Sequence, residues 1–147
     1  MFKHILVPVD GGELSERAIQ ASVDLAAQLG ASITGFVAEP LVPAYAGLRA
    51  PPLTMKEARE HDRMSAGHAG EVLERFEACA REAGVSFHGY YDQVPRVDRA
   101  IIDAAESRGC DMIVMVTHGR GAFGEFLFGS QTKAVLAGSK LPLLVLR

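Results

Sequence analysis

The sequence predicts an open, five-stranded parallel β-sheet with helices on both of its faces. Short apolar segments alternate with longer segments whose apolar residues recur every three or four positions, which is the pattern of a strand–helix–strand chain. Met112–Val116 is wholly apolar, as expected for a parallel strand buried on both faces. The 147 residues, 48% of them hydrophobic, match the size of one domain, so we expect a single domain over residues 1–147.

The amino-terminal part contains two predicted strands with a helix between them. Residues 2–9 form the first strand, and Pro8 lies near its carboxyl end, where a missing N–H is easiest to tolerate. Leucine and alanine residues recur at three- and four-residue spacing over residues 13–29, which indicates a helix that ends at Gly30. Residues 31–39 form the second strand.

A long helix is predicted over residues 54–83, after a loop rich in proline and glycine at residues 41–53. The second half of this helix has an apolar face, whereas its first half is polar and is expected to project into solvent. His61 and His68 lie on it without an accompanying carboxylate–histidine motif. This pattern favours a solvated helix face over a metal site.

The remaining elements repeat the alternation. Residues 85–91 alternate apolar and polar side chains, which suits a strand near the sheet edge. Pro95 begins the next helix, residues 112–116 are the buried fourth strand, and residues 141–146 are the last strand. Right-handed crossovers would place the first and fourth strands side by side, in a three-layer α/β/α fold of the Rossmann-like or flavodoxin-like type.

Two distant stretches therefore meet at one edge of the sheet. Asp10 follows the first strand, where a carboxylate is well placed to bind a ribose hydroxyl or to stabilise the start of the next helix. The fourth strand is followed by a glycine-rich loop and by a helix that begins near Ser130. Glycines allow a close approach of the backbone, and a helix start favours negative charge, so a phosphate is the expected ligand. The ordinary alternative is a loop that only turns the chain.

Neither common phosphate-binding motif is present. The chain has no Gly-x4-Gly-Lys-Ser/Thr segment, and it lacks Gly-x-Gly-x-x-Gly after the first strand. Kinases, GTPases and NAD enzymes are therefore poor matches.

The loop resembles the nucleotide loop of the universal stress protein family. Thr117-His118-Gly119, nine further residues and Gly129-Ser130 follow the pattern of its ATP-binding members, Gly-x-x-Gly-x9-Gly-Ser/Thr. Ile5–Asp10 and Pro142–Leu146 resemble the opening and closing strands of the family, and the resemblance covers essentially the whole chain. One position departs from the pattern, because the first glycine of the motif falls on Val116.

The resemblance implies a domain that binds ATP, with or without Mg²⁺, in a regulatory or stress-response role. Asp10 would bind the ribose, Val9 and Val37 the base, and the loop with the start of the last helix the phosphates. The residues expected to contact the nucleotide are Pro8, Val9, Asp10, Val37, Val116, Thr117, His118, Gly119, Arg120, Gly129, Ser130, Gln131 and Thr132. No paired carboxylates, nucleophile–base pair or metal cluster is recognisable as a catalytic set, so binding is favoured over catalysis, and slow ATP hydrolysis is compatible with it.

Val116 supports a second interpretation, in which a dimeric interaction protein has the same fold but binds no nucleotide. A valine in place of glycine would cost about 1–3 kcal/mol of binding free energy if the ligand cannot shift. Retained nucleotide binding is the favoured interpretation. A third, an ATP-hydrolysing enzyme, is weaker because this loop follows the fourth strand rather than the first.

Composition limits the partners and the location. A net charge of −3 gives no electrostatic footprint for nucleic acid, and no basic block suggests a membrane surface. No apolar run approaches the roughly 20 residues that span a bilayer, and no signal-peptide pattern begins the chain, so we expect a cytoplasmic protein. Cys79 and Cys110 are expected to be reduced thiols.

The late apolar strand, Leu141 to Leu146, would expose unpaired backbone groups at a sheet edge and predicts a homodimer.

Overall fold

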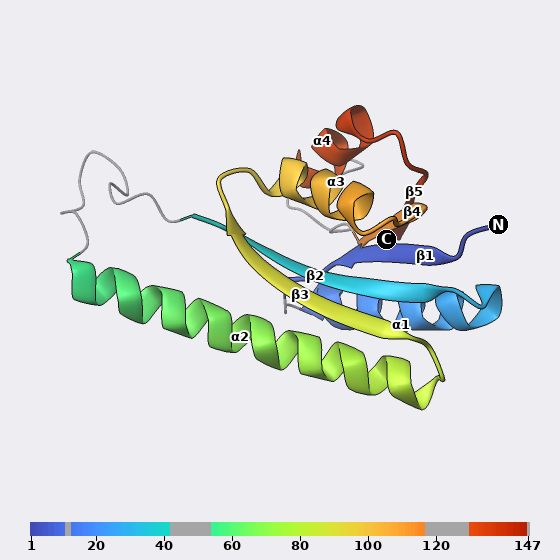
Figure 1. Cartoon of the computed structure of the whole chain (residues 1–147), viewed down its shortest axis with the longest axis horizontal. Helices are drawn as coiled ribbons and strands as arrows, with labels where there is room; N and C mark the ends of the chain where they lie inside the picture. Colours follow the sequence, from blue (N-terminus) through green and yellow to red (C-terminus); the bar gives the residue numbers. More distant parts are fainter. Residues whose placement is uncertain (11–12, 42–53, 117–129, 147) are drawn as a thin grey trace.

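The computed structural model describes residues 1–10, 13–41, 54–116 and 130–146. Strands and helices alternate along these residues, as the sequence predicts (Figure 1). The strands are β1 (His4–Pro8), β2 (Ser32–Pro40), β3 (Phe87–Val94), β4 (Met112–Val116) and β5 (Leu143–Leu146). The helices are α1 (Glu13–Leu29), α2 (Met55–Glu82), α3 (Val97–Ser107) and α4 (Ser130–Gly138).

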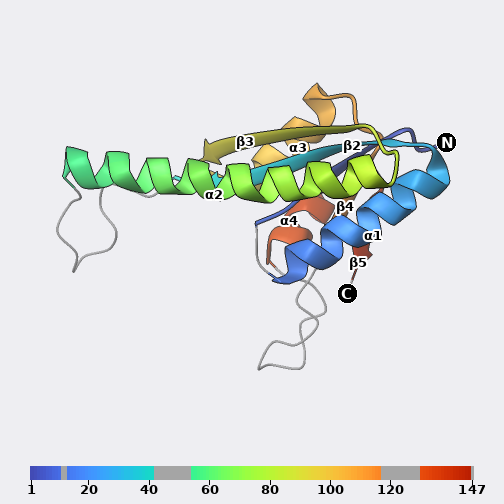
Figure 2. The ribbon, with the colours of Figure 1, turned by 90° about the horizontal axis from the view of Figure 1, so that it is seen from below.

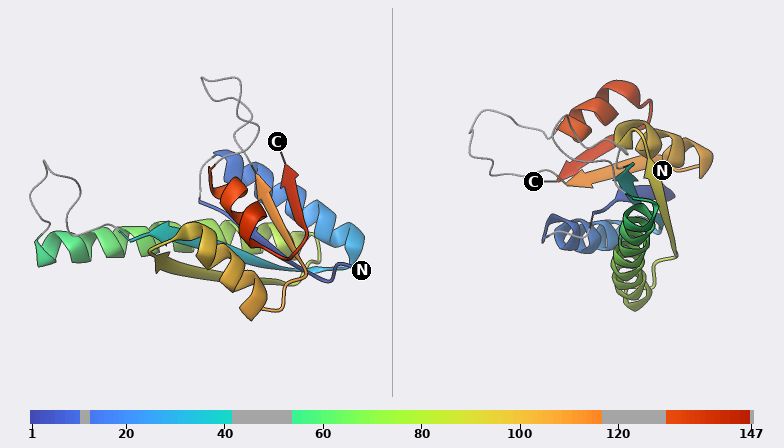
Figure 3. Two further views of the ribbon diagram at one scale, coloured as in Figure 1. Left: turned by 90° about the horizontal axis from the view of Figure 1, so that it is seen from above. Right: turned by 90° about the vertical axis from the view of Figure 1, so that its left-hand side faces the viewer.

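The strands form one parallel sheet in the order β3-β2-β1-β4-β5. Helices α1 and α2 cover one face of this sheet, and α3 and α4 cover the other (Figure 3). The predicted fold class is therefore confirmed. The predicted order is also confirmed, because β1 and β4 are adjacent and β3 and β5 lie at the edges of the described sheet.

Each face of the sheet has its own apolar core. On β1, Ile5 and Val7 belong to the core under α1 and α2, whereas Leu6 belongs to the core under α3 and α4. All three side chains are fully buried. This alternation, apolar on both faces, is the pattern of a central parallel strand.

Helix α2 is longer than the part of the sheet that it covers, and its first half projects past the sheet (Figures 1 and 2). Its buried residues begin only at Ala69, which confirms the predicted projection. A capping box stabilises the projecting end: the Glu57 N–H donates to the Thr54 hydroxyl at 3.2 Å, and the Thr54 N–H donates to the Glu57 carboxylate at 2.7 Å. No helix in the described part of the chain combines the length and the apolar character needed to cross a membrane.

Two predicted helix ends are confirmed by their backbone geometry. Gly30 follows α1 with a φ of 61°, and Gly84 lies just past the end of α2 with a φ of 70°. Side chains with a Cβ rarely adopt this left-handed conformation, so glycine ends each helix without strain.

Strand β3 lies later in the chain than predicted, from Phe87 to Val94 instead of residues 85–91. The Val85 N–H donates to the carbonyl of Ala80 in α2 at 2.8 Å, so Val85 closes the turn that ends the helix and does not pair with β2. Strand β2 is long enough to pair with β3 as far as Val94.

Candidate functional site

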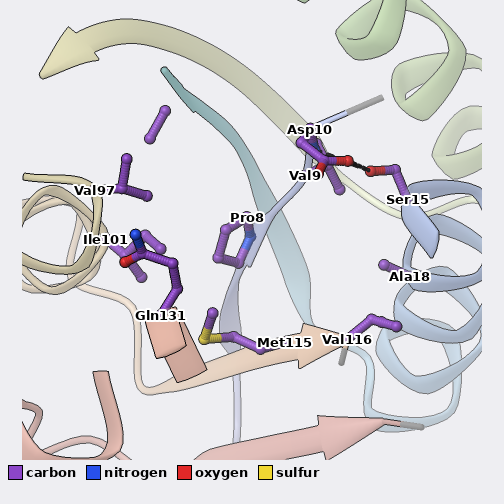
Figure 4. A pocket seen from close by; sticks show the side chains of 11 residues that line it. Pro8, Val9, Asp10, Ser15, Ala18, Val97, Ile101, Met115, Val116 and Gln131 are labelled. Carbon is purple, nitrogen blue, oxygen red and sulfur yellow. Dashed lines mark hydrogen bonds between the residues drawn. The ribbon is translucent and has the colours of Figure 1, made fainter. Parts of the chain in front are cut away.

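A pocket lies at the carboxyl ends of β1 and β4, between α1 on one side and α3 with the start of α4 on the other (Figure 4). The two strand ends meet because Ile5 and Leu6 of β1 pair with Met112 and Ile113 of β4. The cavity holds about 140 Å³. Its lining residues are Pro8, Val9, Asp10, Ser15, Ala18, Ala38, Val97, Ile101, Met115, Val116 and Gln131.

Asp10 is held at the rim of this pocket by the first turns of α1. The Ser15 hydroxyl accepts a hydrogen bond from the Asp10 N–H at 2.9 Å and donates one to Asp10 Oδ1 at 2.8 Å (Figure 4). Ser15 is buried, whereas Asp10 is exposed. The carboxylate therefore contacts the start of the helix, as one of the two predicted roles requires, and its position at the pocket is compatible with the other.

A second helix reaches the same residue. His68 Nε2 of α2 lies 3.0 Å from the main-chain carbonyl oxygen of Asp10. A carbonyl can only accept, so Nε2 carries the hydrogen of this bond. Both His61 and His68 are exposed, as predicted for a solvated helix face, and His68 makes this hydrogen bond in addition.

Five of the predicted nucleotide-contacting residues line the pocket. They are Pro8, Val9, Asp10, Val116 and Gln131. Gln131, in the first turn of α4, extends its side chain into the pocket (Figure 4). The structure thus brings the end of β1, the end of β4 and the start of α4 together around one cavity.

The other described residues of the predicted set lie elsewhere. The Val37 side chain is fully buried in the core under α1 and α2, and its neighbour Ala38 lines the pocket instead. Ser130 is exposed at the start of α4, and Thr132, two residues further on, is buried. Neither Ser130 nor Thr132 is among the pocket-lining residues. The rest of the predicted set lies outside the described residues: Thr117, His118, Gly119, Arg120 and Gly129.

Sequence reasoning missed the apolar wall that α3 contributes. Val97 and Ile101 are four residues apart, which the pattern indicates as a core stripe, but both also face the pocket (Figure 4). No spacing distinguishes a core residue from one that also lines a cavity, so only their place beside β1 and β4 reveals this role. Ser15, Ala18, Ala38 and Met115 were missed for the same reason.

The described residues hold no group of histidine, cysteine or acidic side chains arranged for a metal ion.

The two thiols are poorly suited to nucleophilic chemistry. Burial raises the pKa of Cys110 to about 11. Burial, with the nearby carboxylates of Glu82 and Asp24, also raises the pKa of Cys79. Both thiols therefore stay protonated at neutral pH, where the thiolate is the reactive form.

Comparison with known proteins agrees with this architecture. The model of the universal stress protein family matches residues 1–147. A universal stress protein of Thermus aquaticus is 32% identical over 156 residues, which cover 100% of both chains. One from Methanocaldococcus jannaschii is 26% identical over 151 residues, covering 100% of this chain and 83% of the relative.

Solved structures have the same fold. A universal stress family protein of Burkholderia pseudomallei superposes with a TM-score of 0.78 at 21% identity, covering 99% of this chain and 96% of that one. The Archaeoglobus fulgidus universal stress protein in complex with dAMP gives 0.65 at 17% identity, covering 99% and 98%. A universal stress protein in complex with cAMP gives 0.66 at 21% identity, covering 99% and 97%. The chain belongs to the universal stress protein family.

Proposed function

We propose that this protein binds an adenine nucleotide, with ATP as the first candidate, in the pocket at the ends of β1 and β4. The observation that carries the proposal is the convergence of Asp10, Val116 and Gln131, from three separate elements, on one cavity. Ligands of parallel α/β sheets bind at the carboxyl ends of strands where the strand order reverses, and this pocket lies between β1 and β4 at such a point. The dAMP and cAMP complexes of related proteins support an adenine nucleotide as the ligand class.

Each part of the nucleotide has a suitable partner. Val9, Val97 and Met115 provide apolar surface for the base. The Asp10 carboxylate would accept a hydrogen bond from a ribose hydroxyl. The start of α4, at Ser130, presents main-chain N–H groups and a positive dipole end to the phosphates.

The sequence-predicted loop residues complete the proposed site. In the sequence, the residues that join β4 to α4 include Thr117, His118, Gly119, Arg120 and Gly129. We propose that these residues contact the phosphates and that Mg²⁺ accompanies the phosphates. Val37 would contribute main chain only, because its side chain is buried in the core.

The small volume of the pocket supports a second candidate function. Its volume of about 140 Å³ is below the roughly 300–1,000 Å³ of typical ligand pockets. Val116 forms part of its wall. A dimeric interaction protein with the same fold and no nucleotide is therefore the alternative.

Either function would use a homodimer formed through Leu141 to Leu146. Strand β5 (Leu143–Leu146) lies at the edge of the described sheet, and Leu144 is 36% exposed on it. Pairing with the same strand of a second copy would satisfy its free backbone groups and cover this leucine. We place the protein in the cytoplasm, acting on neither nucleic acid nor membrane.

Calorimetric titration with ATP and Mg²⁺ tests the proposal, together with mass analysis of any nucleotide that copurifies. We expect micromolar binding by the wild type and much weaker binding by Asp10→Asn. Asp103→Asn is the matched control, because Asp103 is an exposed carboxylate on α3 outside this pocket. Absence of binding and of copurifying nucleotide in the wild type would favour the alternative function.

Turnover separates binding from catalysis. We expect phosphate release from bound ATP to be far slower than the 1–10³ s⁻¹ typical of enzymes. Turnover within that range would instead support the ATP-hydrolysing enzyme.

A further inference from the structure

We propose that His68 is a positioning residue of the nucleotide site, which holds Asp10 in the orientation that reads the ribose hydroxyls. The inference rests on the proposed function and adds to it a residue from α2, an element that contributes nothing to the pocket lining. The sequence offers no hint of this role, since the two residues are 58 positions apart.

Asp10 lies just past the carboxyl end of β1. The Val9 N–H still donates to the carbonyl of Phe36 in β2, at 2.9 Å, so the ladder of β1 and β2 extends to Val9. At Asp10 the described main-chain contacts come from side chains instead. Its N–H donates to Ser15 of α1 at 2.9 Å, and its carbonyl accepts from His68 of α2 at 3.0 Å.

These contacts restrain both the side chain and the main chain of Asp10. The Ser15 hydroxyl also binds the carboxylate, so α1 sets the side-chain direction. His68 sets the direction of the carbonyl and limits rotation about the main-chain bond that precedes it. A ligand that hydrogen-bonds to the carboxylate then meets a group that is already oriented, and less conformational entropy is lost on binding.

The position of His68 on α2 follows from the packing of the helix. Ala69 is the first buried residue of α2, and Val72 and Phe76 continue the buried face. His68 is therefore located where the helix leaves the sheet, next to the end of β1. A second polar contact lies nearby, because the Gln93 side-chain amide of β3 donates to Asp62 of α2 at 3.2 Å.

The Gln93–Asp62 contact provides a matched control. It also ties α2, here in its first half, to the end of a strand, but it involves no residue of the pocket. If the His68–Asp10 contact serves only to hold α2 against the sheet, losing it or the Gln93–Asp62 contact would change nucleotide binding in the same way. If His68 orients Asp10, only the loss of His68 would change how the ribose is recognised.

The experiment compares the dissociation constants of ATP and 2′,3′-dideoxy-ATP, which lacks both ribose hydroxyls. The variants are His68→Ala, His68→Gln, Gln93→Ala and His61→Ala. The wild type should prefer ATP. His68→Ala should weaken ATP binding by about 3- to 10-fold, the effect of one hydrogen bond, and leave dideoxy-ATP binding nearly unchanged.

His68→Gln should restore the preference, because the glutamine amide can donate to the Asp10 carbonyl from a similar distance. Gln93→Ala and His61→Ala should behave as the wild type. Thermal unfolding followed by circular dichroism shows that each variant is folded, and little change is expected at His68 because its side chain is exposed.

The possible results distinguish the inference from the function on which it rests. A wild type that binds neither nucleotide overturns the proposed function, and the inference with it. A wild type that binds both equally, or a His68→Ala variant that keeps the full preference for ATP, leaves nucleotide binding intact and overturns the role of His68. Equal losses for both nucleotides in His68→Ala and Gln93→Ala would show that only helix docking matters, which also overturns it.

Discussion

Replacing Val116 with glycine should strengthen nucleotide binding and weaken the fold at the same time. Val116 is the last residue of β4, pairs with Leu146 of β5, and is half-buried. One part of its side chain packs against the core under α1 and α2, and another part lines the pocket. The same two methyl groups therefore stabilise the strand end and occupy the site.

Both effects can be estimated. Removing an overlap worth about 1–3 kcal/mol should raise the affinity for ATP by about 5- to 150-fold. The lost burial of a half-buried valine costs about 1 kcal/mol, and glycine in a strand costs about 0.5–1 kcal/mol more. A total of about 2 kcal/mol corresponds to a decrease in Tm of about 4–8 °C for a chain of this size.

Calorimetric titration with ATP and Mg²⁺, alongside thermal unfolding without ligand, measures the two effects separately. Val116→Ala is the graded control, because it removes both methyl groups and keeps the Cβ that glycine lacks. It should gain most of the affinity with a smaller loss of stability. If both variants are folded and bind ATP no more tightly than the wild type, Val116 does not obstruct the site and the reasoning fails.

Three further predictions follow from the packing, the buried thiol and the sheet edge. Gly35→Ala should destabilise the protein by about 1–3 kcal/mol in urea unfolding, because the new Cβ would lie 2.7 Å from the Phe87 ring. The loss should be smaller in a Phe87→Leu background, and a neutral Gly35→Ala would mean that the ring moves aside freely. Cys110 has a pKa raised to about 11, so its proton is lost more readily from the unfolded chain, and stability should fall as the pH rises from about 9 toward 11. Cys110→Ala should remove this part of the pH dependence, and an unchanged slope would contradict it. Leu144→Asp should shift the proposed dimer to monomer in sedimentation velocity, whereas a monomeric wild type would refute the proposed interface.

The sequence was sufficient for the elements and their order. Apolar periodicity separates helices from strands within windows of a few residues, and glycine marks helix ends such as Gly30 and Gly84 because of its backbone freedom. Right-handed crossovers then leave few ways to arrange the sheet, so the adjacency of β1 and β4 could be predicted. That adjacency in turn locates the pocket near Asp10 and Val116.

The tertiary structure alone decided which side chains face the pocket. Val37 and Ala38 are both apolar neighbours in β2, but successive side chains of a strand point to opposite faces, so Val37 enters the core and Ala38 the pocket. The bond between His68 and Asp10 depends on where α2 docks along the sheet and on how the helix is rotated. Local patterns encode the conformation of a short segment, whereas contacts between distant residues depend on the packing of whole elements, and no single window of the sequence contains that information.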